Sequence, residues 1–137
     1  MPVEPITTLS EQQIDDLLEL YRQEWWTKGR DPEGVRRALQ ASDLIVAFCE
    51  ADTQRLVACT RVLTDYVYKA LILDVIVAPT HRGTGLGKAL LDGVVGHPAL
   101  RAVRHFELYC RPEMMPFYEQ WGFTDDVGVL RFMRRTT

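Results

Sequence analysis

Apolar residues in the N-terminal third of the chain recur with the period of a helix. Ser10 precedes the first of these positions, and Gln13 follows it three residues later, which is the spacing of a capping box. Asp31 followed by Pro32 gives a second start signal, because aspartate caps helices and proline suits the first helical position. The sequence therefore predicts a helix from Ser10 and a second, shorter helix from Asp31. The apolar positions that define the two helices are Ile14, Leu17, Leu18, Tyr21 and Trp25, then Val35, Ala38 and Leu39.

Three apolar stretches in the middle of the chain are rich in β-branched and aliphatic residues, as strands are. They cover residues 44–48, 56–63 and 67–78, and a polar stretch separates the first two. Their order predicts an antiparallel meander. Pro79 ends the third strand, and the glycines at 83–87 precede a further helix. That helix is predicted from the apolar residues Leu86, Leu90, Leu91, Val94 and Val95.

The C-terminal third of the chain predicts two more strands around a short helix. Residues 103–110 alternate between apolar and polar positions, as a half-buried strand does. Residues 112–120 predict a short helical segment that Pro116 interrupts, and residues 128–134 predict a last strand. The chain is thus predicted to fold as a mixed α/β protein, with a single central, mostly antiparallel sheet and flanking helices.

Length and composition narrow the class of protein. A chain of 137 residues with 47% hydrophobic and 26% charged residues fits one domain over residues 1–137 and excludes a largely disordered chain. Its 16 basic and 19 acidic side chains give a net charge of −3, so we expect neither nucleic acid nor a membrane as a partner. No apolar run approaches the roughly 18 residues that cross a bilayer. The three widely spaced cysteines match no disulfide framework, which favours a reducing, cytoplasmic location.

The glycine-rich segment after the third predicted strand carries the most chemical information. Gly83, Gly85 and Gly87 let the backbone turn tightly at the start of a helix. Unpaired N–H groups there point at one spot and the helix dipole adds positive potential, so the segment predicts a phosphate-binding site. Arg82 and Lys88 flank it and offer charged donors to phosphate oxygens. The alternative is a tight turn whose glycines only pack the helix against the strand.

Two common phosphate motifs do not fit this segment. The dinucleotide fingerprint needs a glycine at its sixth place, where Lys88 stands. The nucleotide P-loop needs four residues between its glycines and Ser or Thr after the lysine. Here three residues separate Gly83 from Gly87, and Ala89 follows Lys88. Neither a Rossmann site nor a nucleotide P-loop is therefore expected.

A third pattern does fit, and it is accompanied by a second motif. Residues 82–87, Arg-Gly-Thr-Gly-Leu-Gly, match R/Q-x-x-G-x-G/A between a strand and a helix. Residues 117–123 read Phe-Tyr-Glu-Gln-Trp-Gly-Phe. Both segments, and the order of predicted elements over essentially the whole chain, resemble the GNAT acetyltransferase superfamily. Two positions depart from that pattern: Arg111 replaces a frequent asparagine, and Pro116 lies where the family's helix normally runs on.

The resemblance implies that acetyl-CoA is the acetyl donor. Its pyrophosphate is expected on the backbone amides of the glycine-rich segment, and its pantetheine along the strand before that segment. Tyr118 takes the position of the family's tyrosine that faces the cofactor sulfur and protonates the departing thiolate; a packed helix tyrosine is the alternative. The expected cofactor-site residues are Val75, Ile76, Val77, Arg82, Gly83, Thr84, Gly85, Leu86, Gly87, Lys88 and Phe117.

The resemblance also implies that the acetyl group passes directly from the thioester to an amine. The attacking nitrogen must be neutral, so a base or water must remove a proton from it. Asp74, in the apolar strand before the glycines, is the first candidate, with pairing to an arginine as its alternative role. Glu107, on the neighbouring predicted strand, is the second candidate. Cys110 is expected to share a buried apolar face with Phe106 and Leu108, and so to be inert. The histidines lack metal-ligand spacing, so no metal is expected.

The identity of the acceptor is left open by the sequence, and so is a homodimer. Trp25 and Trp26 are neighbours and cannot both face the core of a helix, so one is expected to line a cleft or a dimer surface, or to lie partly exposed against a loop. An amino acid, a polyamine, an aminoglycoside, a peptide N-terminus and a protein lysine all stay open as acceptors. The alternative function is a non-catalytic domain that binds or senses acetyl-CoA.

Overall fold

A five-stranded sheet forms the centre of the molecule. The computed structural model describes residues 2–137. The strands lie in the order in which they occur along the chain, and they are β1 (Val3–Ile6), β2 (Leu44–Glu50), β3 (Leu56–Thr64), β4 (Lys69–Val77) and β5 (His105–Glu107). Neighbours from β1 to β4 pair antiparallel, and β4 pairs with β5 in parallel. The predicted mixed α/β fold with a mostly antiparallel sheet is therefore confirmed.

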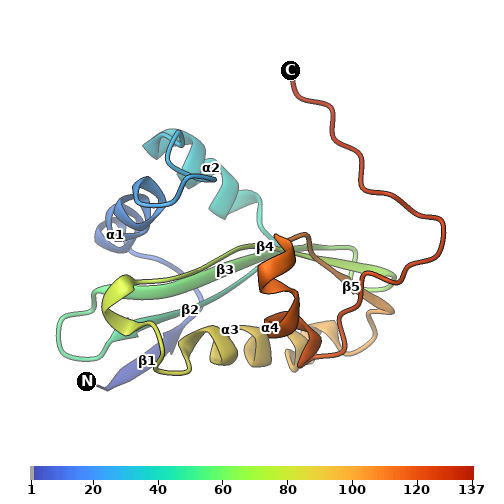
Figure 1. The fold of residues 1–137 in the computed structure, drawn as a ribbon. Coiled ribbons are helices and arrows are strands. Elements are labelled where there is room, and N and C mark those ends of the chain that lie inside the picture. The colour runs from blue at the N-terminus through green and yellow to red at the C-terminus, as the bar shows by residue number, and fades with distance from the viewer. Residues whose placement is uncertain (1) are drawn as a thin grey trace.

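Helices cover both faces of this sheet. They are α1 (Glu11–Arg22), α2 (Pro32–Ala41), α3 (Leu86–Val95) and the short α4 (Met115–Glu119). Figure 1 shows α1 and α2 on one side of the sheet and α3 on the other. Each face thus has a helical layer, which lets the apolar side chains of both faces leave water. The side chains buried most completely include Leu17, Leu56, Leu90, Leu91, Leu100, Val57, Val62 and Val94.

Local capping explains where the first two helices begin. The backbone N–H of Gln13 donates to Ser10 Oγ at 3.2 Å, and the Ser10 N–H donates to Gln13 Oε1 at 3.0 Å. This is the predicted capping box, which satisfies two donors that a helix start otherwise leaves free. At α2, Asp31 accepts from the Gly34 N–H at 2.6 Å and Pro32 occupies the first turn. Both predicted helix starts are confirmed.

The meander of β2, β3 and β4 is confirmed as well, while β1 was not predicted. β1 is only four residues long and contains Pro5. Proline has no N–H to donate to a ladder, and β1 lies at the edge of the sheet, where such a residue is tolerated. A strand this short, interrupted by proline, gives no alternating pattern from which to predict it.

The pairing between β4 and β5 is much shorter than either strand prediction implied. Lys69, Ala70 and Leu71 of β4 pair with residues 105–107, and the ladder stops there. β4 runs on to Val77, so its later residues have β3 on one side and, within residues 2–137, no strand partner on the other. The predicted strand over 103–110 is therefore reduced to three residues. An unpaired edge of β4 is the consequence.

The C-terminal prediction was right about the helix and wrong about the last strand. Pro112–Met114 form a 3-10 turn, and α4 follows with Pro116 in its first turn, where a missing N–H does no harm. Residues 128–134 form no strand; Val129 is 95% exposed, and Figure 1 shows this segment leaving the body of the protein. A strand needs a neighbouring strand whose backbone groups it can pair with, and β5 offers only three residues for such pairing.

Candidate functional site

The glycine-rich segment joins the end of β4 to the start of α3. Gly83 has φ 77° and Gly85 has φ 89°, left-handed values that glycine adopts without a steric penalty. No heavy atom lies within 4 Å of the position that a Cβ would take at either residue. A Cβ on Gly87 would instead lie 3.4 Å from the Phe117 ring. The first two glycines therefore shape an open loop, and the third lets α4 pack against α3.

The first turn of α3 has no side-chain cap. Gly85 is its N-cap and has no side chain with which to accept a hydrogen bond, and the turn contains no acidic residue. The leading N–H groups of a helix have no partner within the helix, and the helix dipole makes this end positive. Leu86 is buried, so only its backbone faces the loop. The left-handed glycines and the uncapped helix start are both present, and phosphate binding by this turn stays a prediction.

The two flanking cations are held in surface ion pairs. Arg82 donates to Glu24 at 2.8 Å and Lys88 donates to Asp92 at 2.7 Å. The side chains of Arg82 and Lys88 are more than half exposed, and pairs of this kind contribute about 0 to 1 kcal/mol. Both side chains can therefore leave their partners for a phosphate at little cost.

A β-bulge interrupts β4 just before the glycine loop. Arg61 of β3 pairs with Leu73, and Cys59 pairs with Ile76, so Asp74 and Val75 together oppose a single residue of β3. Asp74 has φ 56°, which is unusual for a residue other than glycine. Bulges redirect side chains and leave backbone groups outside the ladder. The bulge therefore lies on the same stretch of β4 that lacks a partner on its β5 side.

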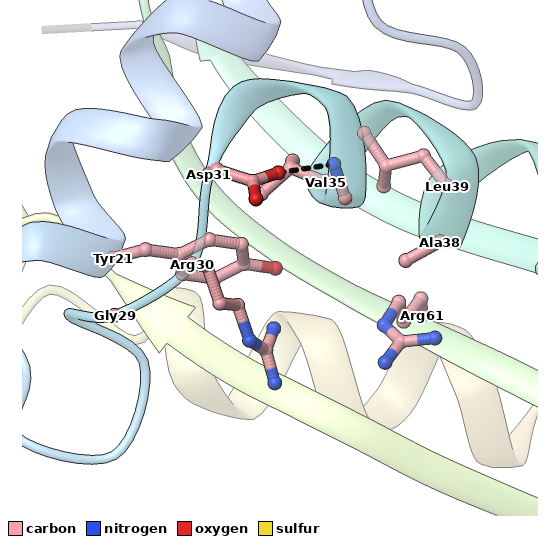
Figure 2. Close-up of a pocket in the computed structure, with 9 residues that line it drawn as sticks. Tyr21, Gly29, Arg30, Asp31, Val35, Ala38, Leu39 and Arg61 are labelled. Carbon is pink, nitrogen blue, oxygen red and sulfur yellow. Dashed lines mark hydrogen bonds between the residues drawn. The ribbon is translucent and has the colours of Figure 1, made fainter.

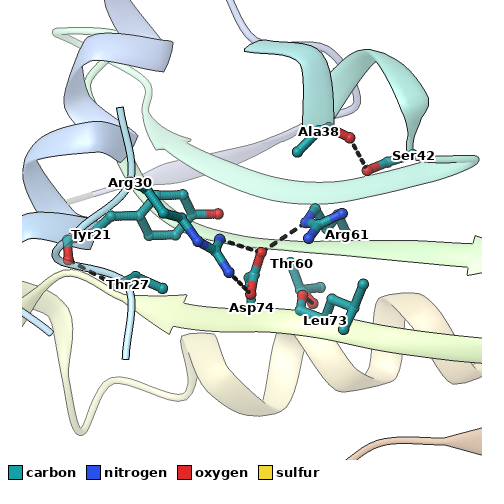
Figure 3. Close-up of polar contacts among 9 residues, drawn as sticks. All are labelled: Tyr21, Thr27, Arg30, Ala38, Ser42, Thr60, Arg61, Leu73 and Asp74. Atoms are coloured by element: carbon teal, nitrogen blue, oxygen red, sulfur yellow. Dashed lines mark hydrogen bonds and ion pairs between the residues drawn. The ribbon is translucent and has the colours of Figure 1, made fainter. Parts of the chain in front are cut away.

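The carboxylate of Asp74 is enclosed by two guanidinium groups, as Figure 3 shows. Arg30 donates to it twice, at 2.6 and 3.0 Å, and Arg61 Nε donates to it at 2.7 Å. Burial raises the pKa of this carboxyl, but the hydrogen bonds and charges of Arg30 and Arg61 outweigh burial and lower it. Asp74 is therefore a fixed ion-pair partner, and a carboxylate with a lowered pKa is a weak base.

Tyr118 is close to the glycine loop. It is 8% exposed, and its ring lies edge-on to the ring of Phe117, with 5.0 Å between the centroids. Phe117 in turn faces Gly87, which links α4 to the first turn of α3. Burial, followed by the influence of Cys110, raises the pKa of Tyr118 to about 12. The phenol therefore keeps its proton at neutral pH and is a hydrogen-bond donor.

Two further predicted residues lie near the point where β4 and β5 separate. Glu107 ends β5, is exposed and accepts from Lys69 Nζ at 2.8 Å. Cys110 is exposed, so the expectation that it shares a buried face with Phe106 and Leu108 is wrong for the cysteine. The alternation fails because the strand ends at Glu107. Partial desolvation and then Glu113 raise the pKa of the Cys110 thiol, which works against a reactive thiolate.

Sequence reasoning did not find the partners of Asp74. Arg30 lies 44 residues away from Asp74 in the sequence. Arg61 lies within β3, and the charge of this residue in an otherwise apolar strand was the only signal that could have identified it as a partner. The two tryptophans of the predicted helix end lie in a turn beyond α1 instead, with Trp25 61% exposed and Trp26 36% exposed. The guanidinium of Arg111 stacks on Trp25 at 4.1 Å from the ring centroid. Both tryptophans are thus at the surface.

The sequence and the fold were both compared with known proteins, and both comparisons identify the same family. The sequence model of the acetyltransferase (GNAT) family matches residues 12–123. A crystal structure from Xanthomonas campestris, assigned to the GNAT acetyltransferases, superposes with a TM-score of 0.85 at 33% identity and covers 100% of this chain and 94% of that chain. A second acetyltransferase structure, from Deinococcus radiodurans, gives a TM-score of 0.79 at 26% identity, covering 97% and 88%.

Curated relatives point the same way. GCN5-related N-acetyltransferase 1, chloroplastic, from Arabidopsis thaliana is 33% identical over 104 residues, covering 76% of this chain and 53% of the relative. Serotonin N-acetyltransferase 2, chloroplastic, from Oryza sativa is 34% identical over 106 residues, with the same two coverages of 76% and 53%. The chain thus spans about half the length of the curated relatives it matches.

Cell location and metal content stay predictions. The two plant relatives carry chloroplastic names, and this does not assign a compartment to the present chain. Within residues 2–137, every helix is too short or too polar to cross a bilayer. In the same part of the chain, no three His, Cys, Asp or Glu side chains are grouped as metal ligands would be.

Proposed function

Because the chain belongs to the GNAT acetyltransferase family, we propose that it transfers the acetyl group of acetyl-CoA directly to a primary amine of a small molecule, peptide or protein. The observation that supports this most is the start of α3, which lacks a side-chain cap, beside the unpaired edge of β4. The rice relative is named for serotonin, which is a primary amine, and this supports an amine as acceptor here.

The chain has a distinct group for each part of the cofactor. The backbone amides from Arg82 to Lys88 bind the pyrophosphate, with the two terminal side chains of this segment adding charge. The unpaired edge of β4 at Val75–Val77 receives the pantetheine, whose amides can hydrogen-bond to a strand edge as another strand would. Ile76 is buried, so its contribution comes from the backbone.

Tyr118 acts as the general acid in this proposal. Bound acetyl-CoA supplies a thioester, whose carbonyl carbon forms a bond to the acceptor nitrogen as its bond to sulfur breaks. The phenol of Tyr118 donates its proton to the departing thiolate, and its pKa of about 12 keeps that proton available at neutral pH. Phe117 positions α4 against the loop that holds the cofactor.

The acceptor nitrogen loses its proton to water or to Glu107, and Asp74 is not used as the base. Glu107 ends β5 where the strands separate, and its pair with Lys69 lies at the surface, so the carboxylate can leave Lys69 at little cost and face the acceptor. Asp74 instead has both oxygens occupied by guanidinium donors. The proposed transfer is direct, without an acetylated cysteine, because partial burial and Glu113 raise the pKa of the Cys110 thiol and so disfavour a nucleophilic thiolate.

The proposal is tested by measuring free thiol released from acetyl-CoA in the presence of a panel of primary amines. We expect thiol release that depends on the amine, an acetylated amine as the product, and no acetyl group on Cys110 by mass spectrometry. Chelators are expected to leave the rate unchanged. If acetyl-CoA binds but no amine accelerates thiol release, the chain is a non-catalytic acetyl-CoA-binding domain instead.

A further inference from the structure

A cavity of about 300 Å³ lies between α2 and the sheet, outside the groups assigned to the cofactor (Figure 2). Val35, Ala38 and Leu39 of α2 form its apolar wall, while Tyr21 and two arginines contribute polar groups. Its volume is at the lower end of the range for small-molecule sites, on the order of 300 to 1,000 Å³. A site of this kind suits a ligand of few atoms with one strongly polar end.

Two groups in the cavity have unused hydrogen-bond donors. Arg61 uses Nε on Asp74, and its terminal nitrogens have no hydrogen-bond partner among residues 2–137, although the side chain is only 15% exposed. Tyr21 is 2% exposed, and its hydroxyl likewise has no partner in the described chain. Figure 2 shows this hydroxyl directed into the space between α2 and Arg61. Burial raises the pKa of Tyr21, so the hydroxyl stays protonated.

The charges around the cavity favour an anion. Arg30 and Arg61 bring two positive charges against the single carboxylate of Asp74. Asp74 is outside the lining, and the carboxylate that does line the cavity, Asp31, is exposed and caps α2 through the Gly34 N–H. A guanidinium presents paired N–H groups that match the two oxygens of a carboxylate, and partial burial strengthens such a pair.

The cavity is also next to the expected reaction centre. Asp74, which fixes Arg61, immediately precedes Val75–Val77, the edge to which we assign the pantetheine. Figure 3 shows Arg30 and Arg61 reaching Asp74 from the side of the sheet that carries α1 and α2. The β4 bulge therefore joins the cofactor edge to the floor of the cavity.

We propose that this cavity binds the acceptor through a carboxylate, held by the terminal nitrogens of Arg61 and the hydroxyl of Tyr21. The acceptor class is then a small amine that carries a carboxylate, as amino acids do. The claim that the bound amine is acetylated rests on the proposed function. The claim that a carboxylate binds here rests only on the residues of the cavity. Arg30 is a positioning residue, because both of its terminal nitrogens hold Asp74.

The test compares amines that differ only by a carboxylate, such as tyrosine with tyramine and lysine with cadaverine. For each pair, kcat/KM is measured by thiol release, and binding of both members is measured by calorimetry on protein loaded with CoA. We expect the wild-type chain to prefer the carboxylated member by at least about tenfold, because losing a hydrogen bond to a charged group typically changes an equilibrium by that factor or more. Arg61→Met is expected to remove this preference while leaving acetyl-CoA affinity unchanged.

Two further variants keep the test decisive. Arg37→Met removes an exposed arginine of α2 that has no ion-pair partner in the described chain, and we expect the wild-type preference to persist. Tyr21→Phe keeps the buried ring and is expected to reduce the preference about threefold or more through a higher KM, even if Arg61→Met folds poorly. A wild-type chain that favours neither member of a pair, or a preference that survives in both cavity variants, overturns the inference.

The calorimetric measurement separates this inference from the proposed function. If no amine yields thiol but the carboxylated members bind more tightly, and Arg61→Met abolishes that difference, the anion site stands and the transferase proposal fails. If amines are acetylated with equal efficiency whether or not they carry a carboxylate, the transferase proposal stands and the anion site is wrong.

Discussion

The glycine loop and the cavity beneath α2 are the two regions that we propose bind an anion, and the proposed donors come from different parts of the chain. At the loop, the donors are backbone N–H groups at the start of α3, and glycines keep side chains away from them. In the cavity, the donors are side chains, and one of them is fixed in place by Asp74. Nearly every residue has a backbone N–H, whereas few residues have a guanidinium.

This difference determines how each site responds to mutation. A site made of backbone groups tolerates the loss of most side chains and fails when a side chain is added where glycine stood. A site made of side chains fails when one of them is removed, because its partners are left without compensation. Variants that remove a side chain should therefore leave acetyl-CoA affinity unchanged while they reduce turnover or acceptor binding.

The largest effect on turnover is expected for Tyr118→Phe. The ring and its contact with Phe117 are kept, while the proton donor for the departing thiolate is lost. A positioned acid typically contributes about 10²- to 10⁴-fold in rate, and a thiolate is already a fair leaving group, so kcat should fall at least about tenfold. Affinity for acetyl-CoA should be nearly unchanged, because the proposed donors to the cofactor are backbone groups of the loop.

Steady-state kinetics and calorimetry on the same preparation check this prediction. A thermal unfolding curve like that of the wild type serves as the control for packing around α4. A wild-type kcat, measured where chemistry limits the rate, would assign Tyr118 to packing alone. A large loss of acetyl-CoA affinity would show that the cofactor site depends on this side chain as well as on the backbone.

A smaller effect, on stability, is expected for Asp74→Asn. The substitution leaves Arg30 and Arg61 facing each other without a counter-charge, which costs about 1 to 3 kcal/mol after allowing for the partial exposure of Arg30. The folded pKa of Asp74 lies below its ordinary value of 3.8, so its stabilising contribution is present above that value and is lost as the pH falls through the folded pKa. The stability difference from the wild type should therefore shrink in acid.

Urea unfolding at neutral pH and at about pH 3 measures this difference. Asp15→Asn is the matched control, because Asp15 is exposed on α1 and has no ion-pair partner in the described chain. The control should change stability little at either pH. If Asp74→Asn is as stable as the wild type at neutral pH, Asp74 does not hold the two arginines in place. The claim that the cavity depends on a fixed arrangement of side chains is then wrong.

Local signals in the sequence were enough to predict most of the fold. Ser10 with Gln13, and Asp31 with Pro32, act within one helical turn, so the sequence alone identifies both helix starts. The glycine loop was predictable for the same reason, since left-handed backbone at Gly83 and Gly85 is a property of those residues themselves. Features that depend on a few neighbouring residues carry over directly from sequence to structure.

Features that depend on residues far away in the sequence could not be predicted in this way. The segment 128–134 has the composition of a strand, but whether it forms one depends on the free length of β5. Cys110 was expected to be buried because the alternation was extended past Glu107, where the ladder ends. The ion pair between Arg30 and Asp74 joins residues 44 positions apart. From the sequence, pairing of Asp74 with an arginine was therefore only the alternative to its role as a base. The single-domain assignment stays a prediction.

The central claim is that the backbone at the start of α3 binds acetyl-CoA, and calorimetry on Gly85→Glu tests it most directly. The added carboxylate would occupy the open space where the pyrophosphate is expected and repel it. Gly128→Glu adds the same charge at another positive-φ glycine, φ 72°, in the exposed C-terminal segment, and serves as the control. The account predicts that Gly85→Glu weakens acetyl-CoA binding at least about 100-fold while Gly128→Glu binds like the wild type. Wild-type affinity in Gly85→Glu would contradict it.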